Sequence, residues 1–448
     1  MFELPNDVAM GGALACVLPE PLRRGRPAVP PPADPDAAAM AAALRRAMEA
    51  IGRTHPNPAV GAVLVRDGRI LAEGATEAYG GRHAERVCLD GLPREATAGA
   101  TLYVTLEPCA HHGRQPPCAD FLAGLPLARV VAAIGDPNPL VGGRGVDRVR
   151  AAGIAVETGV LADAALAWHL PFLHWHTEHR VLFAGKWAQT LDGQLAYDDR
   201  SIRWLSGPPA LAYAHWLRQR YDAIVVGAGT VLADFPRLTV RDCAPPHARN
   251  PVRVAVDPSG RIAAAADDTF ARILGSTFDD AAPSVLATGH AAADALPADR
   301  RATLEAVGTV VLPLPEGPDF LPALAEALGG GALARAVGRP IQSAMVEGGP
   351  QLLGRFGEAG LLHVAHAFVT PRCGGGRQFR IARMAPPHVE PPMATVQCCR
   401  LGEDVLIEYC RPDLADRLAA ACRRPAGQAA ARPVPKPAAA EIAHAERP

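Results

Sequence analysis

Apolar and polar residues in the first part of the chain repeat with periods that favour first a helix and then a hairpin. Apolar residues recur at four-residue spacing over 37–51, which predicts an amphipathic helix, and Asp36 is a suitable N-cap. The runs 60–66 and 69–73 alternate on either side of Asp67-Gly68, a dipeptide typical of a two-residue β-hairpin loop. The folded part of the chain therefore begins with a helix and two paired strands.

Strand-like and helix-like stretches continue to alternate up to residue 178. Short strands are expected over 102–106, 130–134 and 154–157, and helices from His83 onward, over 146–152 and over 163–175. Strands that alternate with helices pack as layers around a sheet. The pattern predicts a layered α/β domain over residues 36–178.

A second alternating series starts at Val181. Strands are expected over 182–191, 222–226, 252–257, 284–287, 309–312 and 344–346, and helices over 208–221 and 350–359. Two of these strands run into glycine turns at helix starts, Gly227-Ala228-Gly229-Thr230 and Glu347-Gly348-Gly349-Pro350, where backbone N–H groups can approach a phosphate. Neither turn has the spacing of the dinucleotide fingerprint, but two of them in one domain favour an anion site. This second α/β domain is placed at residues 181–411.

The composition indicates two folded domains between disordered ends. The chain has 448 residues, and 49% of them are apolar, which is enough for two cores. Its 45 basic and 46 acidic residues give a net charge of −1, which argues against binding to nucleic acid or to an anionic membrane. Residues 1–35 and 412–448 are rich in Pro and Ala and are predicted to be disordered, the second segment after a short helical start. Because no membrane span or signal peptide is recognisable, a cytoplasmic location is expected.

One histidine and two cysteines have the residue types of a zinc site. Cys109 follows Glu107-Pro108 at the expected start of a helix, where free N–H groups favour a thiolate. Cys118 returns after a loop long enough to bring the two sulfurs together, and His83 supplies a third ligand. Three protein ligands leave a fourth tetrahedral position for water, which is the arrangement of a catalytic zinc. Glu85 cannot face the same way as His83 on a helix, so it is placed to serve the water and not the metal.

Three other histidines, His169, His174 and His176, lie close together near the end of the first domain. They suggest a second metal cluster, but no cysteine or carboxylate has a matching spacing. A structural or surface role is therefore favoured. The cysteines outside the zinc site are expected to be reduced thiols and not a disulfide framework.

The zinc residues belong to longer patterns that resemble a known family. His-x-Glu followed by Pro-Cys-x-x-Cys is the signature of zinc-dependent nucleobase deaminases, and the two cysteines are more widely spaced here. The first half of the chain extends this signature with Thr54-His55-Pro56-Asn57-Pro58, Glu107-Pro108-Cys109, His111-His112-Gly113-Arg114, Pro116-Pro117-Cys118 and Asp136-Pro137-Asn138-Pro139. These motifs resemble the deaminase half of the bifunctional riboflavin-biosynthesis deaminase/reductases. Motifs in the second half that resemble the reductase half of the same enzymes are Lys186, Thr190-Leu191-Asp192-Gly193, Gly229–Asp234 and Glu347-Gly348-Gly349-Pro350.

The resemblance implies a three-layer, cytidine-deaminase-like domain followed by a dihydrofolate-reductase-like α/β domain. The first would hold Zn²⁺ through His83, Cys109 and Cys118, with Glu85 as the proton carrier, and would deaminate a diaminohydroxyphosphoribosylaminopyrimidine. The second would use NADPH to reduce the ribose of the deaminated product to a ribityl chain. The residues that the motifs imply for NADPH are Ala188, Trp204, Thr230, Asp234, Gly348, Gly349 and Pro350. Those implied for the substrate are Asn57, Lys186, Arg218, Leu238, Arg241 and Glu347.

The expected partner is therefore a small phosphorylated pyrimidine, with homo-oligomerisation and the choice between NADPH and NADH left open. Three sites depart from the family pattern: Ile202 replaces a serine, Phe235 an acidic or amide residue, and His363-Val364 an Asp-Glu pair. An alternative is an active deaminase fused to a reductase-like domain with altered substrate or without reductase activity. A non-enzymatic zinc module for nucleic acid is disfavoured by the neutral charge and by Glu85.

Overall fold

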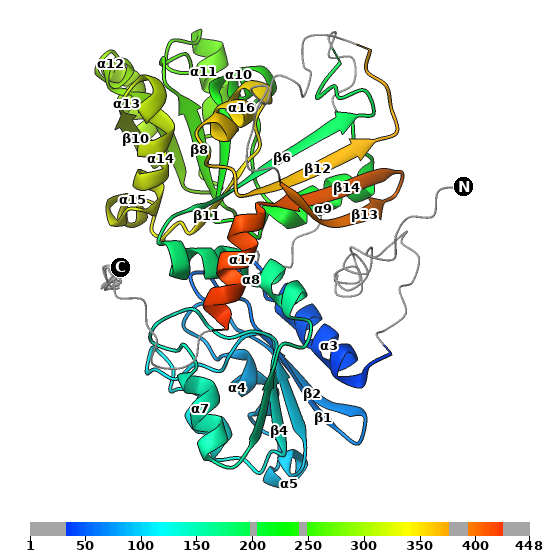
Figure 1. The fold of residues 1–448 in the computed structure, drawn as a ribbon. Helices are drawn as coiled ribbons and strands as arrows, with labels where there is room; N and C mark the ends of the chain where they lie inside the picture. Colours follow the sequence, from blue (N-terminus) through cyan, green and yellow to red (C-terminus); the bar gives the residue numbers. More distant parts are fainter. Residues whose placement is uncertain (1–32, 198–203, 242–248, 376–392, 424–448) are drawn as a thin grey trace.

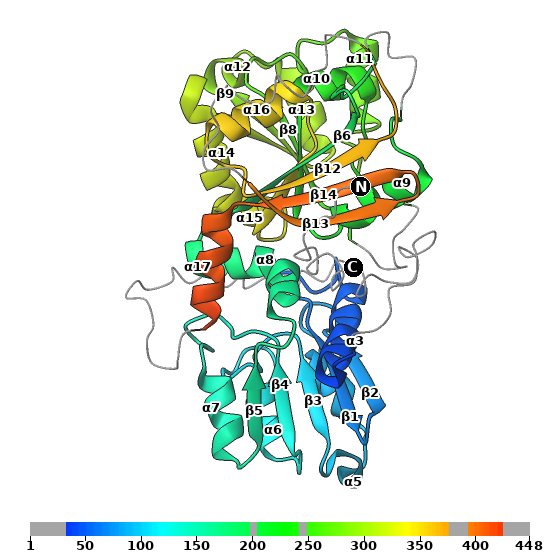
Figure 2. The ribbon, with the colours of Figure 1, turned by 45° about the vertical axis from the view of Figure 1, so that its right-hand side comes forward.

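The computed structural model describes residues 33–197, 204–241, 249–375 and 393–423 of the chain. They form two α/β domains, one above the other in Figure 1. Helix α8 (Ala162–Glu178) leads from the first domain to the second, and α17 (Pro412–Cys422) packs against it after the last strand of the second domain. Figure 2 shows both helices between the two sheets. In the described part of the chain, no helix combines the length and the apolarity that a bilayer crossing requires.

The first domain is a three-layer structure around a five-stranded sheet with the order β2-β1-β3-β4-β5. Its elements are α3 (Pro35–Glu49), β1 (Gly61–Arg66), β2 (Arg69–Ala75), α4 (Ala84–Leu89), α5 (Arg94–Thr97), β3 (Thr101–Val104), α6 (Cys118–Ala123), β4 (Arg129–Ala132), α7 (Arg144–Ala151) and β5 (Ala155–Thr158). Successive strand residues face opposite sides: Val63 and Tyr103 pack with α3 and α8, whereas Leu64 and Leu102 pack with α4 and α6. Helices therefore cover both faces, as the sequence predicted.

The hairpin of the first domain forms as predicted, but the first helix begins earlier than expected. Strands β1 and β2 pair antiparallel across the turn at Asp67-Gly68. Helix α3 is capped by Asp34, whose side chain accepts the Asp36 N–H at 3.1 Å. The prediction that Asp36 is the N-cap is wrong, because its carboxylate instead accepts hydrogen bonds from Tyr103 and Arg129.

The second domain contains a nine-stranded mixed sheet with the order β10-β9-β8-β7-β11-β6-β12-β14-β13. Its strands are β6 (Leu182–Thr190), β7 (Ala223–Gly227), β8 (Val252–Asp257), β9 (Ser284–Gly289), β10 (Thr309–Leu314), β11 (Ser343–Val346), β12 (Val364–Thr370), β13 (Ala394–Leu401) and β14 (Asp404–Cys410). Its helices before α17 are α9 (Pro208–Arg218), α10 (Ala228–Asp234), α11 (Asp267–Leu274), α12 (His290–Asp294), α13 (Ala298–Ala306), α14 (Phe320–Gly329), α15 (Gly331–Ala336) and α16 (Pro350–Glu358). The strands up to β11 match the predicted series, whereas β12, β13 and β14 were not predicted.

The two domains share a continuous apolar core. One cluster of buried side chains contains Leu44 of α3, Trp168 of α8 and Leu414 of α17. Gly135 of the first domain lies against the end of α17, since a Cβ there would come within 2.3 Å of the Cys422 carbonyl oxygen. The short helical start predicted for segment 412–448 is confirmed as α17, and the remainder of that segment, like residues 1–32, lies outside the described residues.

Candidate active sites

Three segments of the first domain bring the predicted zinc ligands together. His83 Nδ1 lies 3.4 Å from Cys109 Sγ and 3.5 Å from Cys118 Sγ. The three ligand atoms all lie within 4.8 Å of one another. One nitrogen and two sulfurs at this spacing fit a single zinc ion with bonds of about 2.0 to 2.3 Å, and leave a fourth ligand position.

The local backbone fixes each of the three predicted zinc ligands. His83 is the N-cap residue of α4, and Cys118 is the first residue of α6. Cys109 lies in the loop after β3, so the prediction that it starts a helix is wrong. The Cys118 backbone N–H donates to Cys109 Sγ at 3.3 Å, and side-chain hydrogen bonding with Cys118 lowers the pKa of the Cys109 thiol to about 4. The site thus favours a thiolate at Cys109, the form that binds metal.

Glu85 lies in the first turn of α4, two residues after His83. Only 3% of it is exposed, and burial raises the pKa of its carboxyl group to about 7. A buried carboxyl group beside a metal site with an open ligand position has the placement of a proton carrier.

Glu107 holds the loop that carries Cys109, although it was not among the predicted site residues. Its buried carboxylate accepts four backbone N–H groups, two on each oxygen. The donors are Asp136 at 3.1 Å, Gly143 at 3.0 Å, Gly145 at 3.0 Å and Val146 at 3.1 Å. These contacts tie the loop of the Glu-Pro-Cys motif to the segment that begins with Asp136-Pro137-Asn138-Pro139.

In the second domain, the two predicted glycine turns lie at one edge of the sheet. Strand β11 pairs in parallel with both β6 and β7, and Val346 is opposite Gly185 and Val225. The residues that follow these positions are therefore neighbours at the carboxyl ends of the three strands. In open α/β sheets this edge is where ligands usually bind.

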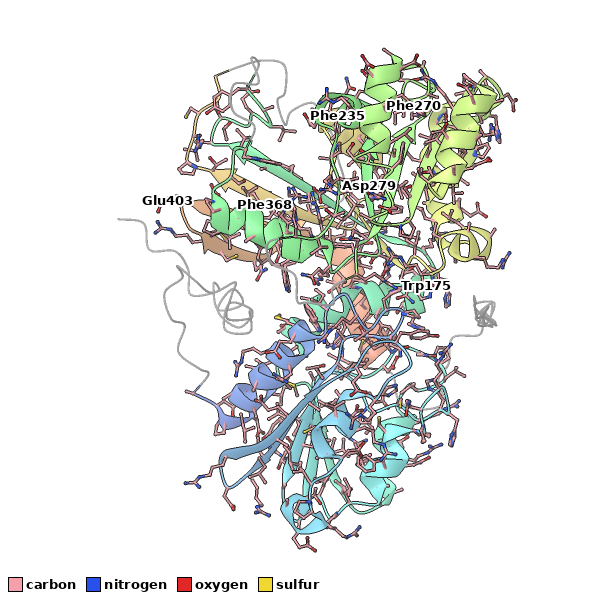
Figure 3. All side chains as sticks on the ribbon, turned by 180° about the vertical axis from the view of Figure 1, so that it is seen from behind. Trp175, Phe235, Phe270, Asp279, Phe368 and Glu403 are labelled. Atoms are coloured by element: carbon pink, nitrogen blue, oxygen red, sulfur yellow. The ribbon has the colours of Figure 1, made fainter. Side chains whose placement is uncertain are left out.

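A cluster of charged side chains occupies this edge. Arg218 binds Glu347 through two contacts, Nε to Oε1 at 2.6 Å and Nη2 to Oε2 at 2.9 Å, and its Nη1 donates to the Thr239 carbonyl at 2.9 Å. Lys186 Nζ lies 3.9 Å from Glu347 Oε2 and 5.4 Å from the ring centre of Phe368, which is labelled in Figure 3. Burial lowers the pKa of Lys186. Burial raises the pKa of Glu347, but the positive charges of Arg218 and Lys186 have the larger effect and lower this pKa to about 2.

The residues predicted for NADPH lie mostly on the elements of this edge. Ala188 is on β6, Thr230 and Asp234 are on α10 after β7, and Gly348, Gly349 and Pro350 connect β11 to α16. A Cβ at Gly348 would lie 2.9 Å from Leu352 Cδ2, whereas a Cβ at Gly349 would meet nothing within 4 Å. The turn before α16 is therefore open to a ligand, and its residues fit a phosphate-bearing cofactor.

The other predicted residues are more dispersed. Leu238 is buried with a φ of 54°, next to the carbonyl that binds Arg218, and Arg241 is exposed. Trp204 is 52% exposed. Asn57 belongs to the first domain, where it lines a cavity of about 90 Å³ at the contact with the second domain. The structure thus brings Arg218, Lys186 and Glu347 together, with Leu238 beside them along the chain, and places Asn57 in the other domain.

Two of the departures from the family pattern have a structural reason. Phe235 adopts a φ of 47° at the C-cap of α10, and the Arg272 guanidinium lies 3.8 Å from its ring centre; Figure 3 labels Phe235. His363 Nδ1 accepts the Phe183 N–H at 3.1 Å, and Val364 starts β12 in the apolar core. Both substitutions therefore serve packing. Ile202 lies outside the described residues.

The histidines of α8 do not form a metal site among the described residues, where only His83, Cys109 and Cys118 meet the geometric criteria of one. His169 is buried and hydrogen-bonds Thr105 Oγ1 at 3.1 Å, and His174 Nδ1 lies 3.0 Å from the Arg180 carbonyl oxygen. Burial lowers the pKa of both imidazoles to about 3. The predicted structural role is consistent with these contacts.

Comparison with protein families places both sites in a known context. The model of the RibD C-terminal domain matches residues 184–407, and that of the cytidine and deoxycytidylate deaminase zinc-binding region matches residues 34–134. The riboflavin biosynthesis protein RibD of Aquifex aeolicus is 37% identical over 75% of this chain and 87% of its own length. The RibD protein of Actinobacillus pleuropneumoniae is 34% identical over 83% and 94%. The chain belongs to the RibD family.

Solved structures of RibD proteins agree with this assignment. The deaminase/reductase of Thermotoga maritima superposes with a TM-score of 0.68 at 31% identity, covering 84% of this chain and 99% of its own. Acinetobacter baumannii RibD gives a TM-score of 0.66 at 29% identity, with 84% and 98% covered. This RibD chain is therefore a bifunctional enzyme of riboflavin biosynthesis, with a zinc-dependent deaminase domain and an NADPH-dependent reductase domain.

Proposed function

We propose that His83, Cys109 and Cys118 hold the zinc ion and that Glu85 carries the proton in deamination. The observation that supports this most directly is the approach of one nitrogen and two sulfurs within 4.8 Å, next to a buried carboxyl group. Zinc in such a site lowers the pKa of a bound water and so supplies a nucleophile near neutral pH. Glu85 would take up the proton and deliver it to the departing amine, which leaves as ammonia.

For the substrate of this domain we infer a phosphorylated aminopyrimidine. The T. maritima relative is named a diaminohydroxyphosphoribosylaminopyrimidine deaminase, and it matches nearly its whole length to this chain. We assign the same substrate here, with Asn57 as a substrate-binding residue. Asn57 belongs to the segment 53–60, whose backbone meets the residues that lead to His83: the Tyr79 N–H donates to the Arg53 carbonyl at 3.2 Å.

In the reductase domain, we propose that NADPH lies along the carboxyl edge of β6, β11 and β7. Its predicted contacts are Ala188, Trp204, Thr230, Asp234, Gly348, Gly349 and Pro350. NADPH supplies the hydride, and the protein aligns it with the ribose of the deaminated product. Lys186 and Glu347 would bind the opened ribose, Arg218 would bind substrate while it orients Glu347, and Leu238 and Arg241 would complete the substrate site.

A coupled assay tests these roles. Purified protein is given the diaminopyrimidine substrate and NADPH, and ammonia release and the loss of nicotinamide absorbance are recorded separately. Both signals should appear. Ammonia release without NADPH oxidation, even with saturating deaminated product, would favour the alternative of a reductase-like domain that has lost or changed its reaction. Sedimentation of the same protein tests for homo-oligomerisation.

A further inference from the structure

His55 makes two polar contacts that cross from the first domain to the second. Its Nδ1 lies 2.8 Å from Asp222 Oδ1, and its Nε2 lies 3.0 Å from the Pro340 carbonyl oxygen. The side chains of His55 and Asp222 are 13% and 8% exposed. A carboxylate and a carbonyl are both acceptors, so the imidazole satisfies them together only when each ring nitrogen donates a hydrogen. Hydrogen bonds to a charged group in a buried setting are among the stronger ones.

Asp222 is itself rigidly held by the second domain. Its Oδ2 accepts the backbone N–H groups of Gln342 and Ser343 at 2.9 and 3.0 Å, and the Ser343 hydroxyl at 3.1 Å. Asp222 directly precedes β7, and Pro340 lies shortly before β11. His55 is therefore bound to the amino ends of two neighbouring central strands, whereas the reductase residues lie beyond the carboxyl ends of the same strands.

The segment around His55 reaches the zinc domain from the other side. The Val60 N–H donates to Thr76 Oγ1 at 3.1 Å, and Trp168 Nε1 donates to the Ala59 carbonyl at 2.9 Å. Residues 76–79 then lead to His83, the N-cap of α4. Segment 52–60 is thus fixed between the second domain and the stretch that carries a zinc ligand, with Asn57 between the two sets of contacts.

We propose that His55 is a positioning residue through which the reductase domain sets the substrate affinity of the deaminase domain. By binding Asp222 and Pro340, it keeps the segment that carries Asn57 in place against residues 76–79, which lead to His83. The inference rests on the proposed role of Asn57 in substrate binding. The proposed coupling acts in one direction: removing the His55 contact changes deamination and leaves reduction intact.

Kinetics of the full-length variants His55→Ala and Asp222→Asn, and of the double variant, test the proposal. We expect His55→Ala to raise the KM for deamination about tenfold, which is about 1.4 kcal/mol, with kcat changed less than about twofold. NADPH oxidation with the deaminated substrate should stay at the wild-type rate. Asp222→Asn should raise the same KM and should have no further effect once His55 is absent. His290→Ala, at an exposed histidine of α12, is the matched control.

Equal losses in both activities would show a general folding defect and overturn the proposal, as would an unchanged deaminase KM or multiplicative effects in the double variant. Hydrogen exchange gives a readout that needs no catalysis. Backbone amides of residues 52–60 should exchange at least about fivefold faster in His55→Ala, with the reductase strands unchanged. If the variant exchanges faster but the wild-type protein does not deaminate, the proposed function is refuted and the positioning role is not. If exchange in the variant is unchanged, the positioning role is refuted.

Discussion

Replacing Glu107 by Gln should destabilise the deaminase domain strongly, although Glu107 is not one of the residues proposed to bind metal or substrate. The two carboxylate oxygens each accept two backbone N–H groups. A glutamine would present an NH₂ group where one oxygen was, so two buried N–H groups would lose their acceptor. Each such loss costs about 1 to 3 kcal/mol, which gives a total of about 2 to 6 kcal/mol. With an m-value of about 2 kcal/mol per molar urea, the unfolding midpoint should fall by about 1 to 3 M.

Urea unfolding of the first domain, followed by zinc release to a chromogenic chelator, measures this loss. Glu95→Gln is the matched control, because it makes the same chemical change at an exposed residue of α5. Zinc should leave Glu107→Gln at lower urea than wild type, since the loop that ends at Cys109 loses its support. A midpoint within about 0.3 M of the control would refute the reasoning that this carboxylate organises the loop.

Three further predictions concern the active sites. Glu85→Gln should retain zinc, measured by metal analysis, but lose at least about 100-fold in ammonia release; retained turnover would exclude it as the proton carrier. Cys118→Ser should lose both zinc and deamination while NADPH oxidation with deaminated substrate stays within about twofold, and a parallel loss of both reactions would contradict independent sites. Glu347→Gln should lower reductase kcat/KM about 100-fold and leave deamination unchanged, because it breaks the contacts with Arg218 and Lys186. Since the folded pKa of Glu347 is about 2 and its ordinary value 4.5, its stabilisation is complete above pH 4.5 and is lost as pH falls towards 2. Acid unfolding of the variant should therefore depend less on pH in this window, and an unchanged dependence would contradict the assigned charge pairing.

Elements whose signals are local were predicted from the sequence, and those that depend on distant partners were not. The hairpin of β1 and β2 was predicted because its turn dipeptide and its alternation lie within a short stretch. Strands β12 and β14 were missed because buried polar residues interrupt their apolar patterns. His366 of β12 and Glu408 of β14 satisfy each other at 2.6 Å, Nδ1 to Oε1. Their pairing arises only when the strands are adjacent, so neither residue alone suggests a buried strand.

The same distinction applies to the deaminase site. The three residues that the structure brings together could be proposed as zinc ligands because only a few residue types bind zinc, and three of them occur with a neighbouring Glu85. The role of Glu107 could not be predicted, because all four of its partners are backbone N–H groups, and every residue except proline has one. The helix expected at Cys109 was also wrong for this reason: proline at 108 suits a helix start, but the contacts of Glu107 hold residue 107 against residues 136–146, and the next helix begins only at Cys118.

The two sites also differ in the interactions that position their residues, and this difference determines how one domain can influence the other. In the reductase domain, Lys186 and Glu347 meet because parallel strands place their carboxyl ends together, a register set by the whole sheet. In the deaminase domain, the chemical residues lie on loops and helix starts, which depend on individual polar contacts. The interface joins the amino ends of the rigid strands, at Asp222, to one of these loops, at His55. A perturbation at the interface therefore moves the loop more easily than the sheet, so coupling between the domains should affect deamination and spare reduction.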